Sequence, residues 1–176
     1  MRIIAGSRKG ARIFAPKGQG TRPTSDRARE AAFNLIGPVD GARVLDLYAG
    51  SGAMGLEALS RGADTTVFVD GERDAITTIQ RNLDKLGLLG ARVAHADSTR
   101  FLATDSGTYD LVLCDPPYER WPQLQDQLAR YLPPRLAPNA LVVLETSARE
   151  PEPVLAGLAL RTSRRYGAAR ITLFEP

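Results

Sequence analysis

Residues 44–55 of the chain read VLDLYAGSGAMG. The first four of them are nearly all apolar, which is typical of a strand buried in the middle of a sheet. Gly50, Gly52 and Gly55 follow in the pattern G-x-G-x-x-G, and a helix over 53–61 is expected directly after the first two. Glycines in this position let the backbone turn tightly and approach a ligand closely. The stretch therefore predicts a nucleotide-type cofactor held between a strand and a helix.

On both sides of that stretch, apolar runs alternate with helical patterns. The runs expected to be strands are 44–47, 65–69, 91–94, 109–114 and 140–145. Two further runs, 159–165 and 169–174, lie on either side of Tyr166-Gly167 and predict a closing antiparallel hairpin. Apolar strands that alternate with helices indicate an α/β fold with a mostly parallel sheet and helices on both faces. Ligands of such sheets bind beyond the carboxyl ends of the strands, where the strand order reverses.

Two acidic residues at strand ends bear on which cofactor binds. Asp70 follows the second strand, 20 residues after Gly50, the usual distance for an acid that holds ribose hydroxyls. Asp46 ends the first strand, where its carboxylate would face the ligand. It would repel the pyrophosphate of a dinucleotide but attract the ammonium and sulfonium of S-adenosylmethionine. We therefore expect S-adenosylmethionine rather than NAD, unless Asp46 only caps a neighbouring backbone turn.

Other residues are expected to complete the cofactor site. Asp97 and Ser98 follow the third strand, where they could accept a hydrogen bond from the adenine amine, but a helix N-cap explains them equally well. Tyr48 would flank the cofactor or simply pack. The full predicted cofactor site is Asp46, Tyr48, Gly50, Ser51, Gly52, Asp70, Asp97 and Ser98.

The tetrapeptide Asp115-Pro116-Pro117-Tyr118 follows the fourth strand and indicates the chemistry. The two prolines stiffen the strand end and remove two amide donors, so that carbonyl oxygens remain free to accept. The Asp115 carboxylate and the Pro116 carbonyl could then hold both N–H groups of an aromatic amine, while Tyr118 stacks on the base. These four residues are the predicted catalytic site for methyl transfer to an exocyclic base amine, a reaction that requires no metal. The alternative is a Pro-Pro turn that merely ends a strand.

Composition limits the remaining possibilities. A chain of 176 residues suits one α/β domain, and its single cysteine, Cys114, excludes an intramolecular disulfide. No stretch approaches the roughly 18 apolar residues of a membrane span. We expect a cytoplasmic protein without a membrane partner, and a monomer.

Charge is concentrated at the N-terminus. The formal net charge is +3, yet residues 1–29 carry eight basic side chains and one acidic one. Residues 1–22 are expected to form a basic β-hairpin extension, in front of the main domain over 23–176. A basic segment on a mildly acidic body suggests a polyanionic partner, although a solvated basic tail would have the same composition. The residues predicted to bind RNA are Arg2, Arg8, Lys9, Arg12, Arg22 and Arg27.

The chain resembles a known family at several of these motifs. The tetrapeptide resembles the amine-methyltransferase motif, and residues 44–55 resemble the cofactor motif of the same superfamily. Residues 22–27, Arg-Pro-Thr-Ser-Asp-Arg, with Phe33-Asn34 resemble the RsmD family, which methylates a guanine N2 amine in bacterial small-subunit (16S) ribosomal RNA. The resemblance covers nearly the whole chain. It implies a class I methyltransferase (Rossmann-like) fold whose seven-stranded sheet ends in an antiparallel strand, and a ribosomal RNA or small-subunit partner. Asp70 stands where relatives often carry Glu.

Two other functions stay open at this point. An adenine or cytosine amine methyltransferase acting on DNA or another RNA can use the same tetrapeptide, although such DNA enzymes usually need a separate recognition region. A non-catalytic RNA-binding module would keep only a relic of the cofactor pocket. An NAD-dependent oxidoreductase is disfavoured by Asp46, and a glutamine-modifying methyltransferase usually has Asn in place of Asp115.

Overall fold

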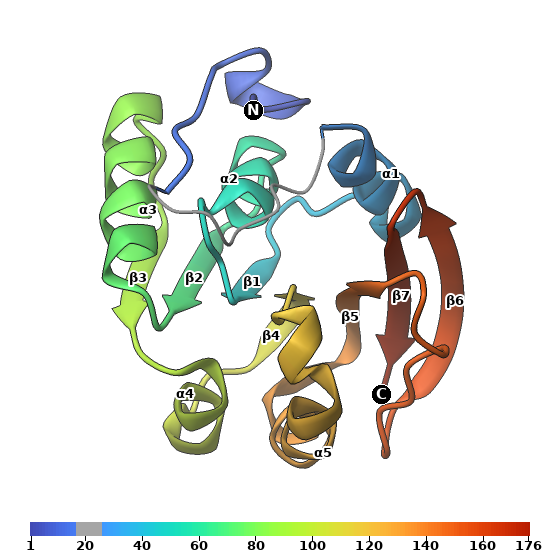
Figure 1. The fold of residues 1–176 in the computed structure, drawn as a ribbon. Coiled ribbons are helices and arrows are strands. Elements are labelled where there is room, and N and C mark those ends of the chain that lie inside the picture. Colours follow the sequence, from blue (N-terminus) through green and yellow to red (C-terminus); the bar gives the residue numbers. More distant parts are fainter. Residues whose placement is uncertain (17–25) are drawn as a thin grey trace.

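The structure is a computed structural model of the chain, and it describes residues 1–16 and 26–176. Seven strands form one sheet in the order β3-β2-β1-β4-β5-β7-β6 (Figure 1). They are β1 (Arg43–Leu47), β2 (Thr65–Asp70), β3 (Ala91–His95), β4 (Tyr109–Cys114), β5 (Leu136–Ser147), β6 (Ala159–Tyr166) and β7 (Ala169–Glu175). β1 to β5 are parallel, whereas β7 is antiparallel to both of its neighbours, β5 and β6. The predicted sheet and the closing hairpin are confirmed.

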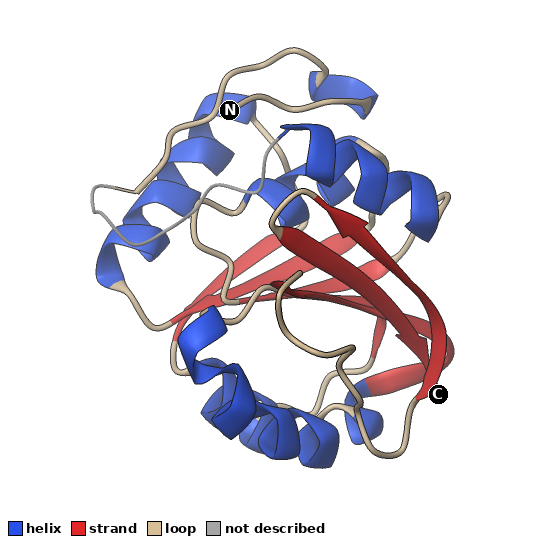
Figure 2. Cartoon of the chain, turned by 45° about the vertical axis from the view of Figure 1, so that its right-hand side comes forward, coloured by secondary structure: helices blue, strands red, loops and turns tan. Residues whose placement is uncertain are grey.

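Helices cover both faces of the sheet (Figure 2). The longer ones are α1 (Asp26–Ile36), α2 (Ala53–Ser60), α3 (Arg73–Leu86), α4 (Ser98–Thr104) and α5 (Trp121–Tyr131). Apolar side chains of α1, α2 and α3 pack on one face, here called the α1 face, and those of α4 and α5 pack on the other, the α5 face. In the described part of the chain, no helix is long and apolar enough to cross a membrane.

Alternation along the strands decides which side chains reach each face. In β1, Leu45 and Leu47 pack in the cluster under α4 and α5, while Val44 packs under α1. Successive side chains of a strand point to opposite faces, so Asp46 belongs to the α1 face. The apolar run is therefore interrupted by an acid on one face only.

The strand order reverses between β1 and β4. The chain continues from β1 outward to β2 and β3, then returns to β4 on the other side of β1. Leu47 at the end of β1 is paired with Cys114 at the end of β4. The loops that follow these two strands contain the glycine pattern and the tetrapeptide, and the fold places them side by side.

The described part of the N-terminal segment is paired with itself over a short antiparallel stretch. Arg2 and Arg12 form an antiparallel bridge, the Ile3 N–H donates to the Ala11 carbonyl at 2.9 Å, and a 3-10 turn over Gly6–Arg8 joins the two sides. The turn follows from contact with α2, because the backbone of Gly6 approaches the Ser60 carbonyl so closely that any side chain there would overlap it. The predicted boundary after residue 22 lies outside the described residues.

Buried Glu57 explains how this segment is held. Its side chain is inaccessible to solvent and accepts hydrogen bonds from the backbone N–H groups of Ile4 and Ala5, at 2.8 and 2.9 Å. Arg61 and Arg29 form ion pairs with the same carboxylate. Two backbone donors of the segment, those of Ile4 and Ala5, are thus paired by a side chain of α2.

Candidate active site

The glycine loop turns by placing three residues in the left-handed region. The φ angles of Tyr48, Gly50 and Gly52 are 57°, 56° and 76°, and α2 begins directly after Gly52. Nothing lies within 4 Å of the position that a Cβ would take at Gly50, so the loop backbone is open there. The left-handed region is uncommon for a residue other than glycine, and such strain is often found at functional sites.

Asp70 ties this loop to the second strand. One of its carboxylate oxygens accepts the Gly50 N–H and the other accepts the Glu72 N–H, both at 2.8 Å. The side chain is largely buried. Each carboxylate oxygen has a second lone pair, so a ribose hydroxyl can still be accepted while these bonds persist.

Asp46 lies on the α1 face, directly beneath the start of α2. Its Oδ2 accepts the backbone N–H of Gly55 at 2.9 Å. Burial raises the pKa of Asp46 to about 8; the Gly55 hydrogen bond opposes this rise and the charge of Asp70 adds to it. The alternative interpretation of Asp46, as a cap for a backbone turn, thus describes a contact that is present. A carboxyl with so high a pKa also suits a site that a cation will enter.

Asp97 and Ser98 have structural partners of their own. Asp97 is the N-cap of α4 and accepts the backbone N–H groups of Thr99 and Arg100, each at 3.1 Å. Its hydrogen bond with the Thr99 hydroxyl is the main reason why its pKa is lowered. Ser98 is buried, and its Oγ accepts the N–H of Tyr48 at 3.2 Å. The helix-cap alternative is confirmed for Asp97, and its predicted contact with adenine stays a prediction.

Tyr48 combines a strained backbone with an unsatisfied side chain. Its ring packs against the core of the α5 face, and its hydroxyl is buried without a hydrogen-bond partner among the described residues. Burial raises the pKa of Tyr48 above its ordinary value. Buried hydroxyls usually have a partner, and the place of Tyr48 beside the cofactor stays a prediction.

The tetrapeptide continues β4 past its last paired residue. The Asp115 N–H donates to the Leu47 carbonyl at 3.4 Å, which joins the tetrapeptide to the end of β1. Pro116 is buried and Pro117 is exposed. Tyr118 begins a 3-10 turn, and its hydroxyl donates to Oε1 of Glu145 at 3.1 Å.

Acidic residues at the ends of three neighbouring strands line one small cavity. Its volume is about 20 Å³, and Asp46, Asp115 and Glu145 all line it, between α1 and the sheet. A space of this size holds about one water molecule, so a base would bind at its mouth. The sequence interpretation did not include Glu145. The sequence feature that could have identified Glu145 is its position directly after the apolar run of β5, equivalent to the position of Asp70 at the end of β2.

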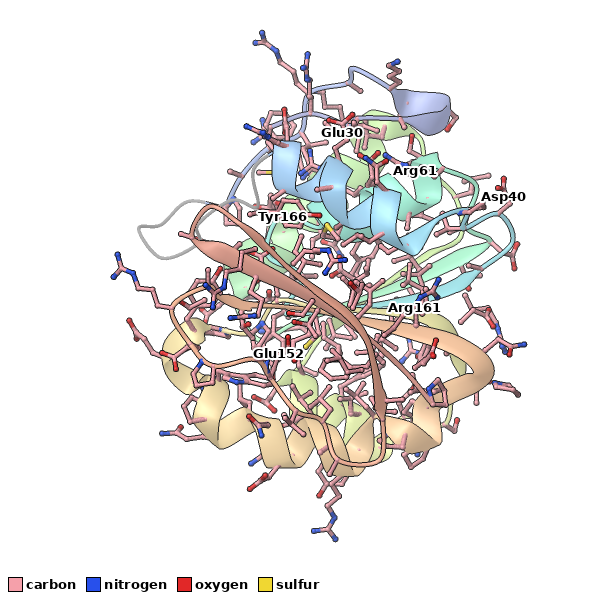
Figure 3. The ribbon with its side chains drawn as sticks, turned by 90° about the vertical axis from the view of Figure 1, so that its right-hand side faces the viewer. Glu30, Asp40, Arg61, Glu152, Arg161 and Tyr166 are labelled. Atoms are coloured by element: carbon pink, nitrogen blue, oxygen red, sulfur yellow. The ribbon has the colours of Figure 1, made fainter. Side chains whose placement is uncertain are left out.

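The terminal hairpin borders the same edge of the sheet. Ala169 of β7 is paired with Ser147 at the carboxyl end of β5, so the turn between β6 and β7 lies at the edge that carries the loops. Tyr166, at the end of β6, packs against the α1 face, and Figure 3 shows it beside α1. Ile171 reaches the cavity from this hairpin.

The basic residues predicted to bind RNA do not share one surface. The Arg8 guanidinium donates to the carbonyls of Leu86 and Gly87 at the end of α3. Because α3 runs back from the carboxyl end of β2, its last turn lies at the opposite edge of the sheet. Arg8 and the adjacent Lys9, both exposed, therefore lie far from the glycine loop.

The other predicted RNA contacts lie nearer to the site. Met1 is hydrogen-bonded to Ser51 of the glycine loop, and Arg2 forms an ion pair with Asp26 in the first turn of α1. Arg2, Arg12 and Arg27 are exposed around this end of α1. Arg22 lies outside the described residues.

Comparison with known proteins places the chain in a family. The family model described as conserved hypothetical protein 95 matches residues 1–175. Ribosomal RNA small subunit methyltransferase D of Escherichia coli is 34% identical over 179 residues, which cover 99% of this chain and 89% of that protein. YlbH of Bacillus subtilis is 46% identical over 124 residues, or 68% of this chain and 67% of that one. A solved structure from Thermus thermophilus superposes with a TM-score of 0.86 at 30% identity, covering 100% of this chain and 99% of that one. The chain therefore belongs to the RsmD family of methyltransferases and has the class I, Rossmann-like fold.

Proposed function

We propose that this protein transfers the methyl group of S-adenosylmethionine to the exocyclic N2 amine of a guanine in small-subunit (16S) ribosomal RNA, within an assembled or partly assembled subunit. The observation that carries the proposal is that Asp46 and Asp115 line one cavity at the point where the strand order reverses. One carboxylate suits a cationic cofactor and the other suits an amine. The name of the E. coli relative supports ribosomal RNA as the substrate.

The residues of the glycine loop fit the proposed cofactor. The open backbone at Gly50 would admit the ligand, Asp70 would accept the ribose hydroxyls and Asp46 would pair with the ammonium. Tyr48 and Asp97 would border the adenosine. S-adenosylmethionine, when bound, supplies a methyl group already activated by a sulfonium.

The tetrapeptide would supply the alignment for transfer. An amine on an aromatic ring is a poor nucleophile, because its lone pair is delocalised into the ring. The Asp115 carboxylate and the Pro116 carbonyl would each accept one N–H and turn the lone pair out of the ring plane, while Tyr118 stacks on the base. As the N–C bond would form and the methyl–sulfur bond would break, releasing S-adenosylhomocysteine, positive charge would develop on nitrogen, where Asp115 would stabilise it. The proton then leaves to Asp115 or to water.

Access to the site constrains the RNA. A base inside a helix cannot reach Asp115, so the target is single-stranded or flipped out. Arg2, Arg12 and Arg27 would neutralise phosphates of the RNA, and affinity would then fall with salt. A ribosomal substrate also fits a cytoplasmic, monomeric enzyme.

Methylation of hypomethylated small subunits tests the proposal. Purified protein and cofactor labelled in the methyl group are incubated with the subunits, and the RNA is digested to nucleosides. We expect label in N2-methylguanosine, and its loss in Asp115→Ala with cofactor affinity retained. Label in N6-methyladenine would support the adenine alternative instead. If the wild-type protein binds the subunits but transfers no label, the result would support the non-catalytic RNA-binding module.

A further inference from the structure

Glu145 lies beside Asp115 on the same face of the sheet. Leu113 and Cys114 of β4 are paired with Val143 and Leu144 of β5. One more step along both strands brings Asp115 next to Glu145. Leu113 and Val143 pack under α1, so the residues two positions later also point to the α1 face. Both side chains line the cavity described above.

Glu145 is also joined to the residue proposed to stack on the base. Its Oε1 accepts the hydroxyl of Tyr118 at 3.1 Å. The two carboxylates therefore line one cavity at the carboxyl edge of β4 and β5, and the Tyr118 hydroxyl contacts one of them. Neighbouring strands are about 4.8 Å apart, which lets two carboxylates reach adjacent groups on the edge of a single base.

The edges of the bases differ in a way that a second carboxylate can detect. In guanine, the N2 amine is next to N1–H, so two donors stand side by side. In adenine and cytosine, the reactive amine is next to a ring nitrogen that carries a lone pair and accepts hydrogen bonds. A carboxylate beside Asp115 would accept N1–H of guanine but would face that lone pair in the other two bases.

We infer that Glu145 accepts the N1–H of the guanine whose N2 amine is held by Asp115, and that it thereby selects guanine over adenine and cytosine. The inference rests on the proposed function and names the group that makes it specific. A site built to bind a particular donor rejects an analogue that lacks it, and here the half-buried carboxylate would face a lone pair in place of the N1–H.

A substrate whose N1 carries no hydrogen provides the test. 2-Aminopurine keeps the exocyclic 2-amine of guanine, but it has no hydrogen on N1 and no oxygen on C6. Once nucleoside analysis has located the methylated position, small subunits are reconstituted with RNA ligated to carry guanine or 2-aminopurine there. The measured quantity is the ratio of kcat/KM for the two subunits, with wild-type protein and with Glu145→Gln.

The Gln variant is expected to lose selectivity. A Gln side chain has the same shape but can donate to N1 of 2-aminopurine as well as accept from guanine. The ratio of kcat/KM for guanine over 2-aminopurine should be roughly 10- to 100-fold smaller in Glu145→Gln than in wild type. Circular dichroism and cofactor affinity serve to show that the variant is folded.

Tyr118→Phe is the matched control, because it removes the hydrogen bond to Glu145 and leaves both the ring and the carboxylate. It should keep the guanine preference within about threefold of wild type. If Glu145 only positions Tyr118, the two variants will instead lower the rates on both subunits alike, and the inference is overturned.

The remaining outcomes separate the inference from the proposed function. If guanine is methylated but the kcat/KM ratio is the same in Glu145→Gln as in wild type, only the role of Glu145 is refuted and the proposed function stands. Methylation of an adenine by the wild-type protein refutes the guanine selectivity and leaves amine transfer intact. No transfer by the wild-type protein to any base overturns both.

Discussion

The carboxylate of Asp46 accepts the backbone N–H of Gly55 at 2.9 Å in a position that is only 4% exposed. This contact joins the first strand to the first helix that follows it, and it holds an acid where water cannot solvate its charge. The pKa of Asp46 is about 8 because burial outweighs the Gly55 hydrogen bond. In the protein without cofactor, the group is therefore largely protonated at neutral pH.

Binding of S-adenosylmethionine should release a proton. The ammonium of the cofactor would lower the pKa of Asp46, so that the carboxyl ionises as the pair forms. Affinity should then rise as pH increases from 6 towards 8, by up to about tenfold per pH unit, and level off above 8. Calorimetry at pH 7 in two buffers of different ionisation enthalpy measures the proton directly. An affinity that is flat between pH 6 and 8 would contradict the pairing.

The same pKa predicts a stability effect for Asp46→Asn. In the folded protein the pKa is about 8, whereas an unfolded Asp has its ordinary value of 3.8. The native state therefore binds more protons than the unfolded state between these values, and wild-type stability falls as pH rises from about 4 to about 8. Asn does not ionise, so the variant should gain relative to wild type over this window, reaching roughly 2–5 kcal/mol at pH 8.

Urea unfolding at pH 5 and pH 8 measures this difference, and the variant should bind the cofactor poorly at both. Equal stability differences at the two pH values would show that Asp46 is not the titrating group. A gain in stability together with a loss of binding is the usual relation when a buried charge is kept for function.

Gly55→Ala should be destabilising although it lies in a helix. A Cβ at this position would lie 2.4 Å from the ring of Phe68 and 2.9 Å from Oδ2 of Asp46. Overpacking of this kind typically costs about 1–3 kcal/mol, more than the roughly 0.5–1 kcal/mol that Ala gains over Gly in a helix. Gly71→Ala is the control, because its Cβ would have only an ordinary contact at 3.9 Å with the Ala96 carbonyl. Thermal unfolding of both variants measures the difference. If Gly55→Ala were as stable as Gly71→Ala, α2 would be able to shift away from the sheet at little cost in stability.

The ring and the hydroxyl of Tyr118 should contribute differently. Tyr118→Ala removes the stacking surface, and kcat/KM on small subunits should fall by about 5- to 100-fold, in line with the roughly 1–3 kcal/mol of base stacking. Tyr118→Phe keeps the ring and should retain most of the activity. Cofactor affinity, measured in parallel, should stay unchanged in both. A Phe variant as inactive as the Ala variant would show that the hydroxyl, rather than the ring, matters.

The sequence predicted those parts of the site that depend on local pattern. The strand with its glycine loop and the tetrapeptide are each defined by adjacent residues, and the fold brought them together as expected for a parallel sheet. Glu57 shows why other parts were missed. In the helical pattern after Ala53 it looks like an exposed charge, but its partners Ile4, Ala5 and Arg29 come from distant segments and bury it completely.

The role of Glu145 and the contacts of the N-terminal segment could not be predicted for a related reason. The register between β4 and β5, which places Glu145 beside Asp115, is a tertiary property that one strand does not reveal. The apolar runs on either side of residues 6–10 predicted a hairpin with a basic turn, and Arg2 and Arg12 of these runs form an antiparallel bridge. The sequence did not reveal what the turn contacts: the Arg8 N–H donates to Ser60, and the backbone of Gly6 closely approaches the same residue.

Substitution of Arg8 and Arg27 should separate a structural arginine from one that contacts RNA. Arg8 pairs the last carbonyls of α3, so Arg8→Ala should lower the free energy of unfolding by roughly 0.5–1.5 kcal/mol and leave RNA affinity nearly unchanged. Arg27 is exposed in the first turn of α1, next to Asp26, the ion-pair partner of Arg2. Arg27→Ala should leave stability unchanged and reduce the slope of log affinity against log salt by up to about 1. Binding to small subunits at several salt concentrations, together with urea unfolding, measures both quantities. If only Arg8→Ala reduced the salt slope, the RNA would bind at the opposite edge of the sheet, away from Asp115. Arg8 would then contact RNA without helping to bring the base into the site.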